Sequence, residues 1–161
     1  NEKMRVLRDH GMSSTRKYWH DHIGFNYRMT NLQAAIGVAQ LERIEDILMH
    51  RRQMEAEYRE ELKTLNNITF QNDGLPNRKK VTWFVSVLVD SVKRDAYIEE
   101  LNQLGIDSRP FFYSLGEMPL YQGFVHSDDV AKKLARQGIC LPTNKHLDEE
   151  VRKKIHEVLK R

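Results

Sequence analysis

The chain has 161 residues, a length typical of one domain, or of one domain and part of another. Of these residues 40 % are hydrophobic and 30 % are charged, a composition typical of a globular protein rather than of a disordered chain. Its 26 basic and 23 acidic residues give a net charge of +3, and because the basic residues are scattered, this excess does not indicate a nucleic-acid partner. No apolar run is long enough to indicate a membrane-bound protein, and the single cysteine, Cys140, excludes an internal disulfide and fits a reducing, cytoplasmic location.

Residues 1–29 mix apolar and polar side chains and are not expected to form a compact unit alone. They include His20 and His22 on either side of Asp21. These two histidines and one carboxylate are three possible metal ligands without a fourth, so they indicate a metal site only weakly. A structural or interface role is therefore the preferred interpretation, and no metal is expected.

A long helix is predicted to begin at Thr30, because Thr30 and Gln33 fit a capping box. Apolar residues then recur mostly every three or four positions up to residue 65, which is a helical pattern. A helix of about 35 residues would be roughly 50 Å long, more than an ordinary globular helix. We expect that it either bends near Met49 and His50 or bridges two domains, and that it ends at Asn66 and Asn67.

The rest of the chain alternates between strand and helix patterns. The segments predicted to be extended are 68–70, the β-branched and aromatic run 81–89, 107–113 and 139–142. A helix is predicted at 91–104 and ends at Gly105 in a left-handed conformation. Two more are predicted to begin at caps formed by Ser127 and Asp148. This order of elements predicts a small α+β domain whose sheet is covered by helices.

The segment just before the long helix places an amide and a guanidinium two residues apart, at Asn26 and Arg28. In an extended chain such residues point the same way, and their donors could hold an anion such as a phosphate. The alternative is that Asn26 caps a turn while Arg28 pairs with an acidic residue of the long helix. The residues alone favour this structural alternative.

The run GFNYRMTNLQAAIGVAQLERI, residues 24–44, closely resembles a signature of the pyridoxal-phosphate-dependent sugar-nucleotide aminotransferases of the DegT/DnrJ/StrS type. The segment VLRDHGMSSTRKYWHDH before it, and GIDSRPFFYSLGEMPLYQ and GICLPTNKHLDEE after it, occur in the family's order. The resemblance therefore covers nearly the whole chain.

This resemblance implies an α+β fold, the small C-terminal domain of a fold type I transferase, at residues 67–161. A long interdomain helix at 30–66 and the tail of the large cofactor-binding domain at 1–29 would precede it. In the family, the asparagine of Gly-x-Asn-x-Arg reaches the cofactor phosphate of the other subunit. The resemblance thus implies that Gly24, Asn26 and Arg28 bind pyridoxal 5'-phosphate in a homodimer with shared active sites, with Phe25 and Tyr27 anchoring this edge in the interface.

The resemblance also implies the substrates, which would be glutamate as amino donor and a 4-keto-6-deoxy sugar nucleotide as acceptor. Arg109, Phe112 and Tyr113 would face the substrate. Arg109 could bind a carboxylate or a diphosphate, and the two aromatic residues could line the sugar or the base. The alternative is an arginine paired with a helix acid and two core aromatics. Tyr121 and Lys145 are weaker candidates.

The sequence departs from the family pattern in two places. The lysine that forms the Schiff base with the cofactor, in a Lys-x-x-x-x-Gly-Glu-Gly-Gly context before Arg-Asp-His-Gly, does not occur here, and Gly116 stands where many members have histidine. We therefore expect the C-terminal part of an enzyme, inactive alone and without a catalytic residue of its own. A non-catalytic regulatory or interaction module on the same scaffold, and a binding domain that dimerises through the long helix, remain alternatives.

Overall fold

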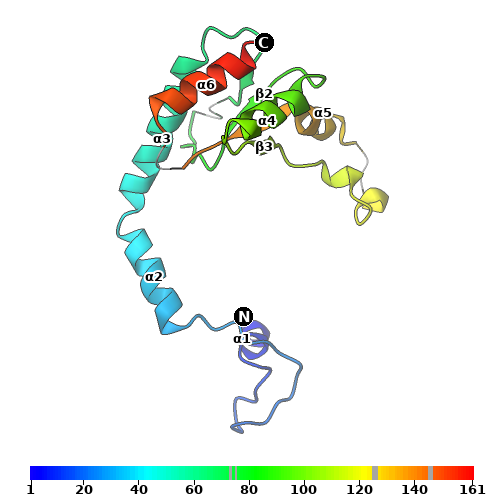
Figure 1. Ribbon diagram of the computed structural model, residues 1–161. Helices are drawn as coiled ribbons and strands as arrows, with labels where there is room; N and C mark the ends of the chain where they lie inside the picture. The colour runs from blue at the N-terminus through cyan, green and yellow to red at the C-terminus, as the bar shows by residue number, and fades with distance from the viewer. Residues whose placement is uncertain (73, 75, 125–126, 145–146) are drawn as a thin grey trace. The chain divides into compact units, whose positions relative to one another are not determined.

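The computed structural model describes residues 1–161 except 73, 75, 125–126 and 145–146 (Figure 1). The chain divides into two compact units, Asn1–Glu45 and Asp46–Arg161. The boundary between them lies within the segment predicted as one long helix. Each unit contains part of the predicted site, with Asn26 and Arg28 in the first unit and Arg109 in the second.

The first unit contains helix α1, Glu2–Arg8, an irregular segment, and helix α2, Asn31–Leu41. The capping box predicted at Thr30 is confirmed. The Thr30 hydroxyl accepts a hydrogen bond from the Gln33 backbone N–H at 3.3 Å, and the Gln33 side chain accepts one from the Thr30 N–H at 2.9 Å. The entrance of α2 is therefore fixed directly after the segment that contains Asn26 and Arg28.

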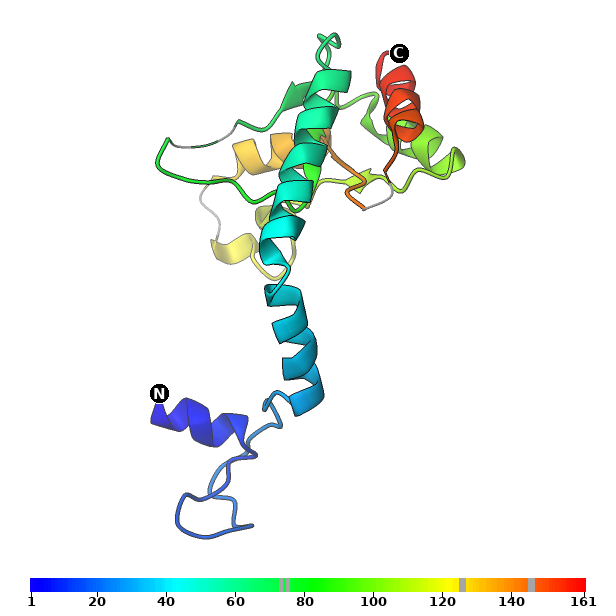
Figure 2. The same ribbon diagram turned by 90° about the vertical axis from the view of Figure 1, so that its left-hand side faces the viewer.

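The predicted long helix is interrupted between α2 and α3, Ile44–Glu61 (Figure 2). The prediction of a bend near Met49 and His50 is wrong, because the break lies at Glu42 and Arg43. There the Arg43 N–H bonds to the carbonyl of Gln40, three residues earlier, at 3.2 Å. This tighter turn replaces the four-residue spacing of the α-helix.

The second unit contains a four-stranded antiparallel sheet in the order β1-β2-β4-β3. The strands are β1, Thr69–Phe70; β2, Val85–Leu88; β3, Arg109–Pro110; and β4, Gly138–Leu141. Among the described residues of this unit, three α-helices follow α3: α4, Arg94–Gln103; α5, Asp129–Gln137; and α6, Glu149–Leu159. Two short 3-10 helices, η1 at Leu115–Glu117 and η2 at Gln122–Phe124, precede α5. The predicted order of strands and helices is confirmed.

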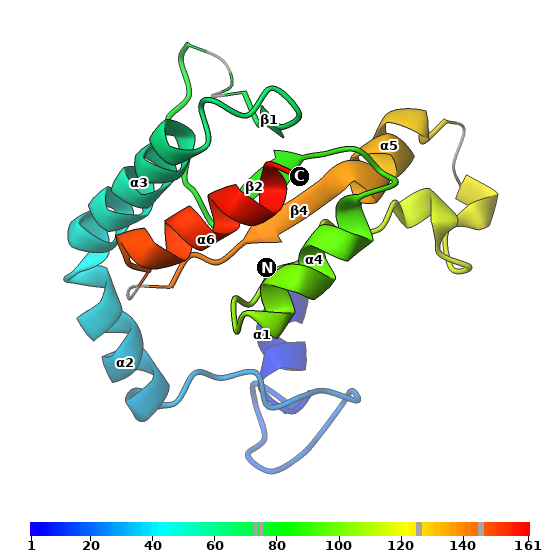
Figure 3. The ribbon, with the colours of Figure 1, turned by 45° about the horizontal axis from the view of Figure 1, so that its top comes forward.

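The core lies between one face of the sheet and helices α3, α4 and α6 (Figure 3). Alternate residues of β2, Val85 and Val87, point into it and are almost fully buried. Each fully buried apolar side chain contributes about 1.5–3 kcal/mol. Tyr58 on α3 is fully buried, and its hydroxyl donates to the Pro142 carbonyl at 3.0 Å. This contact ties α3 to the end of β4.

The local predictions in this unit have mixed outcomes. Gly105 has a φ of +75°, as expected for a left-handed cap, and the Asp148 side chain accepts from the Val151 N–H at 2.9 Å at the start of α6. Strand β2 is shorter than the predicted 81–89, because the segment before it bonds to α3 instead of to a strand. Asp128, rather than Ser127, occupies the cap position of α5, and its carboxylate accepts from the Ser114 hydroxyl.

Candidate functional site

The predicted phosphate edge is an extended segment held along the last residues of α1 and Asp9, which follows them. The Phe25 N–H donates to the Leu7 carbonyl at 2.7 Å, and the Tyr27 N–H donates to that of Arg8 at 3.0 Å. Asn26 itself forms an isolated antiparallel bridge with Asp9. The backbone thus has the extended geometry in which Asn26 and Arg28 share a side.

Gly24 is required by packing of the first unit. A Cβ on Gly24 would lie 2.0 Å from the backbone nitrogen of Gly11, far inside contact distance. Gly11 has a φ of +68°, and a Cβ there would lie 1.9 Å from the carbonyl oxygen of His22. The Gly24 position predicted for cofactor binding therefore brings two chain segments together and sets the edge in place.

Arg28 and Asn26 both present polar groups at the surface of the first unit. Arg28 Nη1 lies 3.4 Å from each carboxylate oxygen of Asp9, and its side chain is 65 % exposed. Its acidic partner is thus Asp9 rather than a residue of the long helix. The Asn26 side chain is exposed and has no hydrogen bond to any described residue, so it caps no turn in this structure.

These groups fit a phosphate. The free Asn26 amide offers two donors, and a guanidinium matches the oxygens of a phosphate. The exposed pair between Arg28 and Asp9 contributes only about 0–1 kcal/mol, so a phosphate could replace Asp9 at little cost.

An apolar surface adjoins this edge. The Phe25 and Tyr27 rings stack with centroids 5.3 Å apart and are 53 % and 73 % exposed. Helix α2 has no buried residue. Six exposed large apolar side chains of this unit, called the apolar surface of the first unit below, are Trp19, Phe25, Tyr27, Met29, Leu32 and Ile36. Large apolar side chains exposed in this number are consistent with a surface that another protein chain covers.

The second unit has a cleft of about 450 Å³, called the Arg109 cleft below. Basic and aromatic side chains from distant parts of the sequence line it together: Arg51, Trp83, Phe84, Arg109 and Lys154. Three cations facing one cleft favour an anionic ligand, and the aromatic rings offer surfaces on which a planar group can stack.

Arg109 lies at the edge of the sheet and is oriented by neighbours on either side. Its Nη2 is 2.7 Å from the carboxylate of Asp107, and its guanidinium lies 5.9 Å from the centre of the Phe84 ring. The side chain is 57 % exposed. The alternative of a pair with a helix acid is wrong, because Asp107 belongs to the loop before β3, and the guanidinium remains accessible from the cleft.

The alternative that Phe112 and Tyr113 are core aromatics is also wrong, since they are 60 % and 70 % exposed. Phe112 stacks on Trp83 with ring centroids 6.1 Å apart, which extends the aromatic wall of the cleft. Tyr113 and Tyr121 do not line the Arg109 cleft. Gly116 lies in η1, and Lys145 lies outside the described residues.

Sequence reasoning missed Arg51 and Lys154. Arg51 Nη1 donates to the carbonyls of Trp83 and Thr143, at 3.2 and 2.8 Å, and so joins two of the segments that line the cleft. A hydrogen bond from Lys154 to Glu150, 2.7 Å long, raises the pKa of the lysine, which stays charged at neutral pH. Both residues looked like solvated helix positions, and only the fold places them together.

The histidines near the N-terminus have a structural contact. His20 Nδ1 lies 2.9 Å from the carbonyl oxygen of His10. In the part of the chain that the structure describes, no three potential metal-ligating side chains come together. Within the same residues, no helix is both long and apolar enough to span a membrane.

Residues 1–160 match the model of the DegT/DnrJ/EryC1/StrS aminotransferase family. The chain belongs to this family. It is 41 % identical to the GDP-perosamine synthase of Caulobacter vibrioides over 152 residues, which is 91 % of this chain and 41 % of that protein. It is 34 % identical to the GDP-perosamine synthase of Vibrio cholerae, covering 99 % of this chain and 44 % of that one. The chain thus spans less than half the length of these relatives.

One further relative is named for sensory transduction rather than for an enzymatic activity. The erythromycin biosynthesis sensory transduction protein EryC1 of Saccharopolyspora erythraea is 29 % identical over 99 % of this chain and 43 % of its own length.

Solved structures confirm the predicted fold. The aminotransferase TlmJ from Streptoalloteichus hindustanus superposes with a TM-score of 0.84 at 23 % identity, over 99 % of this chain and 43 % of that one. DesV from S. venezuelae, solved with a ketimine intermediate, gives 0.77 at 27 % identity, over 99 % and 43 %. Spr1654 from Streptococcus pneumoniae, solved in its PLP form, gives 0.80 at 21 % identity, over 99 % and 42 %. The family indicates pyridoxal phosphate as the cofactor.

Proposed function

We propose that this chain is the C-terminal part of an aminotransferase that uses pyridoxal phosphate to move an amino group from glutamate to a 4-keto-6-deoxy sugar nucleotide. The product would be a perosamine-like precursor of a surface polysaccharide such as the O-antigen of lipopolysaccharide, made in the cytoplasm. The similarity to two GDP-perosamine synthases supports this substrate class. The observation that carries the proposal is the exposed donor pair of Asn26 and Arg28 within a family signature.

In the proposed homodimer, the edge of one subunit completes the cofactor site of the other. Asn26 and Arg28 would hold the cofactor phosphate, and the packing of Gly24 on Gly11 would keep that edge in place. When bound, pyridoxal phosphate supplies the electron sink for amino transfer. The apolar surface of the first unit supports the dimer, because Phe25 and Tyr27 expose large rings beside the same donors.

The Arg109 cleft is the proposed subsite for the acidic part of a substrate. Arg109, with Arg51 and Lys154, offers positive charge to a diphosphate or a carboxylate. Phe112 would offer a stacking surface for the base or the sugar through the aromatic wall that it forms with Trp83. A role for Tyr113 in substrate binding remains a prediction, since this residue is exposed outside the cleft.

A regulatory function on the same scaffold is the second candidate. It is favoured by the similarity to the sensory transduction protein EryC1. That similarity, at 29 % identity, is lower than the 41 % shared with a GDP-perosamine synthase over a comparable part of the chain. The enzymatic proposal is therefore preferred.

Isotope transfer tests this choice. The intact protein, loaded with pyridoxal phosphate, is incubated with glutamate labelled with nitrogen-15 and a 4-keto-6-deoxy sugar nucleotide. The enzymatic proposal predicts a labelled amino sugar nucleotide in the mass spectrum. Tight binding of the sugar nucleotide without any label in it, across the common nucleotides, would support the regulatory alternative.

A further inference from the structure

A second basic cleft, called the α3 cleft below, lies between helix α3 and the segment that precedes β2. Its volume is about 390 Å³. The described residues that line it are Arg52, Glu55, Ala56, Arg59, Arg78, Lys79, Lys80 and Thr82. It shares none of these residues with the Arg109 cleft. Five are basic and one is acidic, so the described lining is strongly positive.

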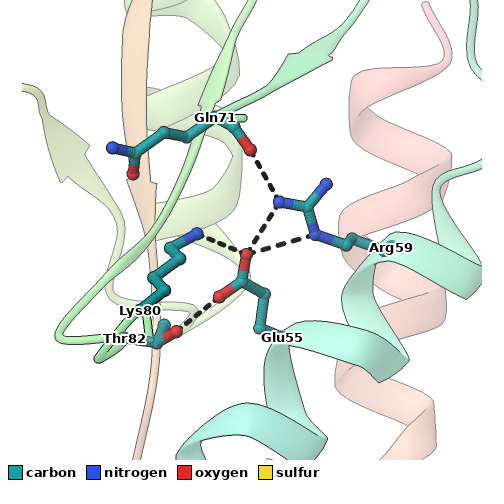
Figure 4. Close-up of polar contacts among 5 residues, drawn as sticks. All are labelled: Glu55, Arg59, Gln71, Lys80 and Thr82. Carbon is teal, nitrogen blue, oxygen red and sulfur yellow. Dashed lines mark hydrogen bonds and ion pairs between the residues drawn. The ribbon is translucent and has the colours of Figure 1, made fainter. Parts of the chain in front are cut away.

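The one carboxylate in this lining is already saturated with donors (Figure 4). Glu55 Oε1 accepts from Arg59 Nη2 at 2.9 Å and from Lys80 Nζ at 2.5 Å, and Oε2 accepts from the Thr82 hydroxyl. Burial raises the pKa of Glu55, but the hydrogen bonds from Lys80, Thr82 and Arg59 outweigh burial and lower it. Glu55 is therefore ionised at neutral pH, and its charge is used by Arg59 and Lys80.

The remaining cations of this lining have no such partner in the part of the chain that the structure describes. Arg52 Nε is buried and has no hydrogen-bond acceptor among the described residues. Arg78 and Lys79 are exposed, and within the same residues neither forms an ion pair. A buried donor without an acceptor costs about 1–3 kcal/mol, and more when the group is charged. An oxyanion from outside the chain would supply the acceptor that Arg52 Nε lacks and would lie beside the two exposed cations.

We propose that the α3 cleft binds a phosphate or diphosphate group through Arg52, Arg78 and Lys79. A phosphate carries more charge than a carboxylate and offers more acceptor oxygens, which suits three cations around one cleft. The group can come from inorganic phosphate or from a nucleotide. The site is separate from the one proposed for the sugar nucleotide and does not depend on it.

Equilibrium dialysis of the full chain against labelled pyrophosphate at low ionic strength tests this site. Arg52→Gln should weaken the binding about tenfold or more, because a hydrogen bond to a charged group is lost. Arg43→Gln is the matched control, since Arg43 is exposed and lies outside both clefts. Arg109→Gln should leave this Arg52-dependent binding unchanged.

Competition identifies the source of the phosphate. Equal displacement by a nucleoside diphosphate and by unlabelled pyrophosphate supports a site that recognises phosphate alone. A nucleoside diphosphate that competes about tenfold better supports a nucleotide site. If Arg52→Gln does not fold, as judged by circular dichroism, Lys79→Gln takes its place. No measurable binding, or equal binding by the Arg52→Gln and Arg43→Gln proteins, would overturn the proposal.

Discussion

Gly11 and Gly24 pack backbone to backbone, so closely that a Cβ on Gly24 would lie 2.0 Å from the nitrogen of Gly11. The neighbour is main chain rather than a movable side chain, so this contact cannot relax without shifting the edge that contains Asn26. Gly24 is therefore a structural requirement of the proposed cofactor edge.

Gly24→Ala should destabilise the first unit by about 1–3 kcal/mol, as overpacking typically does. The measurement is the rate of limited proteolysis between α1 and α2, which should rise. Gly37→Ala is the control, because nothing lies within 4 Å of a Cβ placed there on α2. That change should leave the rate equal or lower, since alanine favours a helix by about 1 kcal/mol over glycine. Equal rates for wild type and Gly24→Ala would contradict the packing argument.

Glu55→Gln should lower the stability of the second unit by about 1–3 kcal/mol, because Arg59 and Lys80 lose a buried counter-charge while staying partly solvated. The check is the urea midpoint at pH 7. Glu60→Gln removes a largely exposed carboxylate of the same helix and should change stability by no more than about 0.5 kcal/mol.

The same carboxylate predicts a pH dependence. The folded-state pKa of Glu55 lies below its ordinary value of 4.5. Its contribution is therefore fully present above that value and is lost as the pH falls below it towards the folded-state pKa. Wild type and Glu55→Gln should differ in urea midpoint at pH 7 and converge in strong acid. If the urea midpoints of the two proteins differ by the same amount at every pH in this window, the charge of Glu55 contributes nothing to stability.

The chain by itself should form no stoichiometric covalent adduct with pyridoxal phosphate and should not transfer amino groups. The reason is that the sequence has no lysine in the Lys-x-x-x-x-Gly-Glu-Gly-Gly context. Borohydride reduction followed by mass mapping gives the answer. A single adduct on one lysine of this chain, together with turnover, would refute the prediction.

The chain should also self-associate through the apolar surface of the first unit. Ile36 on α2 is 59 % exposed, and Ile36→Glu should weaken the association by placing a charge in it. Val92→Glu, at a residue 87 % exposed in the second unit, is the control and should leave association unchanged. Sedimentation at several concentrations measures both. A wild-type chain that stays monomeric and binds no hydrophobic dye would argue against this interface.

Local signals predicted much of the fold. The Thr30 and Asp148 caps and the left-handed Gly105 depend on a few adjacent residues, and each is found where expected. The break at Arg43 was missed because the apolar spacing continues through it. Strand β2 was predicted too long because side-chain contacts from Arg51 and Glu55 of α3 compete with sheet pairing for residues before it.

The candidate site was less predictable, because its parts meet only in three dimensions. The sequence drew attention to Arg109 and Phe112, but Arg51 and Lys154 join them only through the fold. Likewise, nothing local indicates that Arg28 pairs with Asp9 on the preceding segment. The motif alone favoured a structural interpretation, and the family resemblance was needed to propose a cofactor role.

Asn26→Ala in the intact protein should weaken cofactor binding without affecting folding. A hydrogen bond to a charged group contributes roughly 1.5–3 kcal/mol, which corresponds to a rise of about 10- to 100-fold in the dissociation constant. The Asn26 side chain has no hydrogen bond to any described residue, so the melting temperature of the cofactor-free form should barely change. A large drop in that temperature would indicate a structural role instead.

Subunit mixing tests the shared active site most directly. Subunits with Asn26→Ala are mixed with subunits whose cofactor-anchoring lysine is replaced, and subunit exchange is verified independently. If Asn26 serves the partner's cofactor, each mixed dimer has one site that lacks both groups and one that has both, so activity should recover up to one intact site per mixed dimer. If exchange is complete and no activity recovers, Asn26 acts within its own subunit or not at all. The proposed binding of the partner's cofactor by this edge is then wrong.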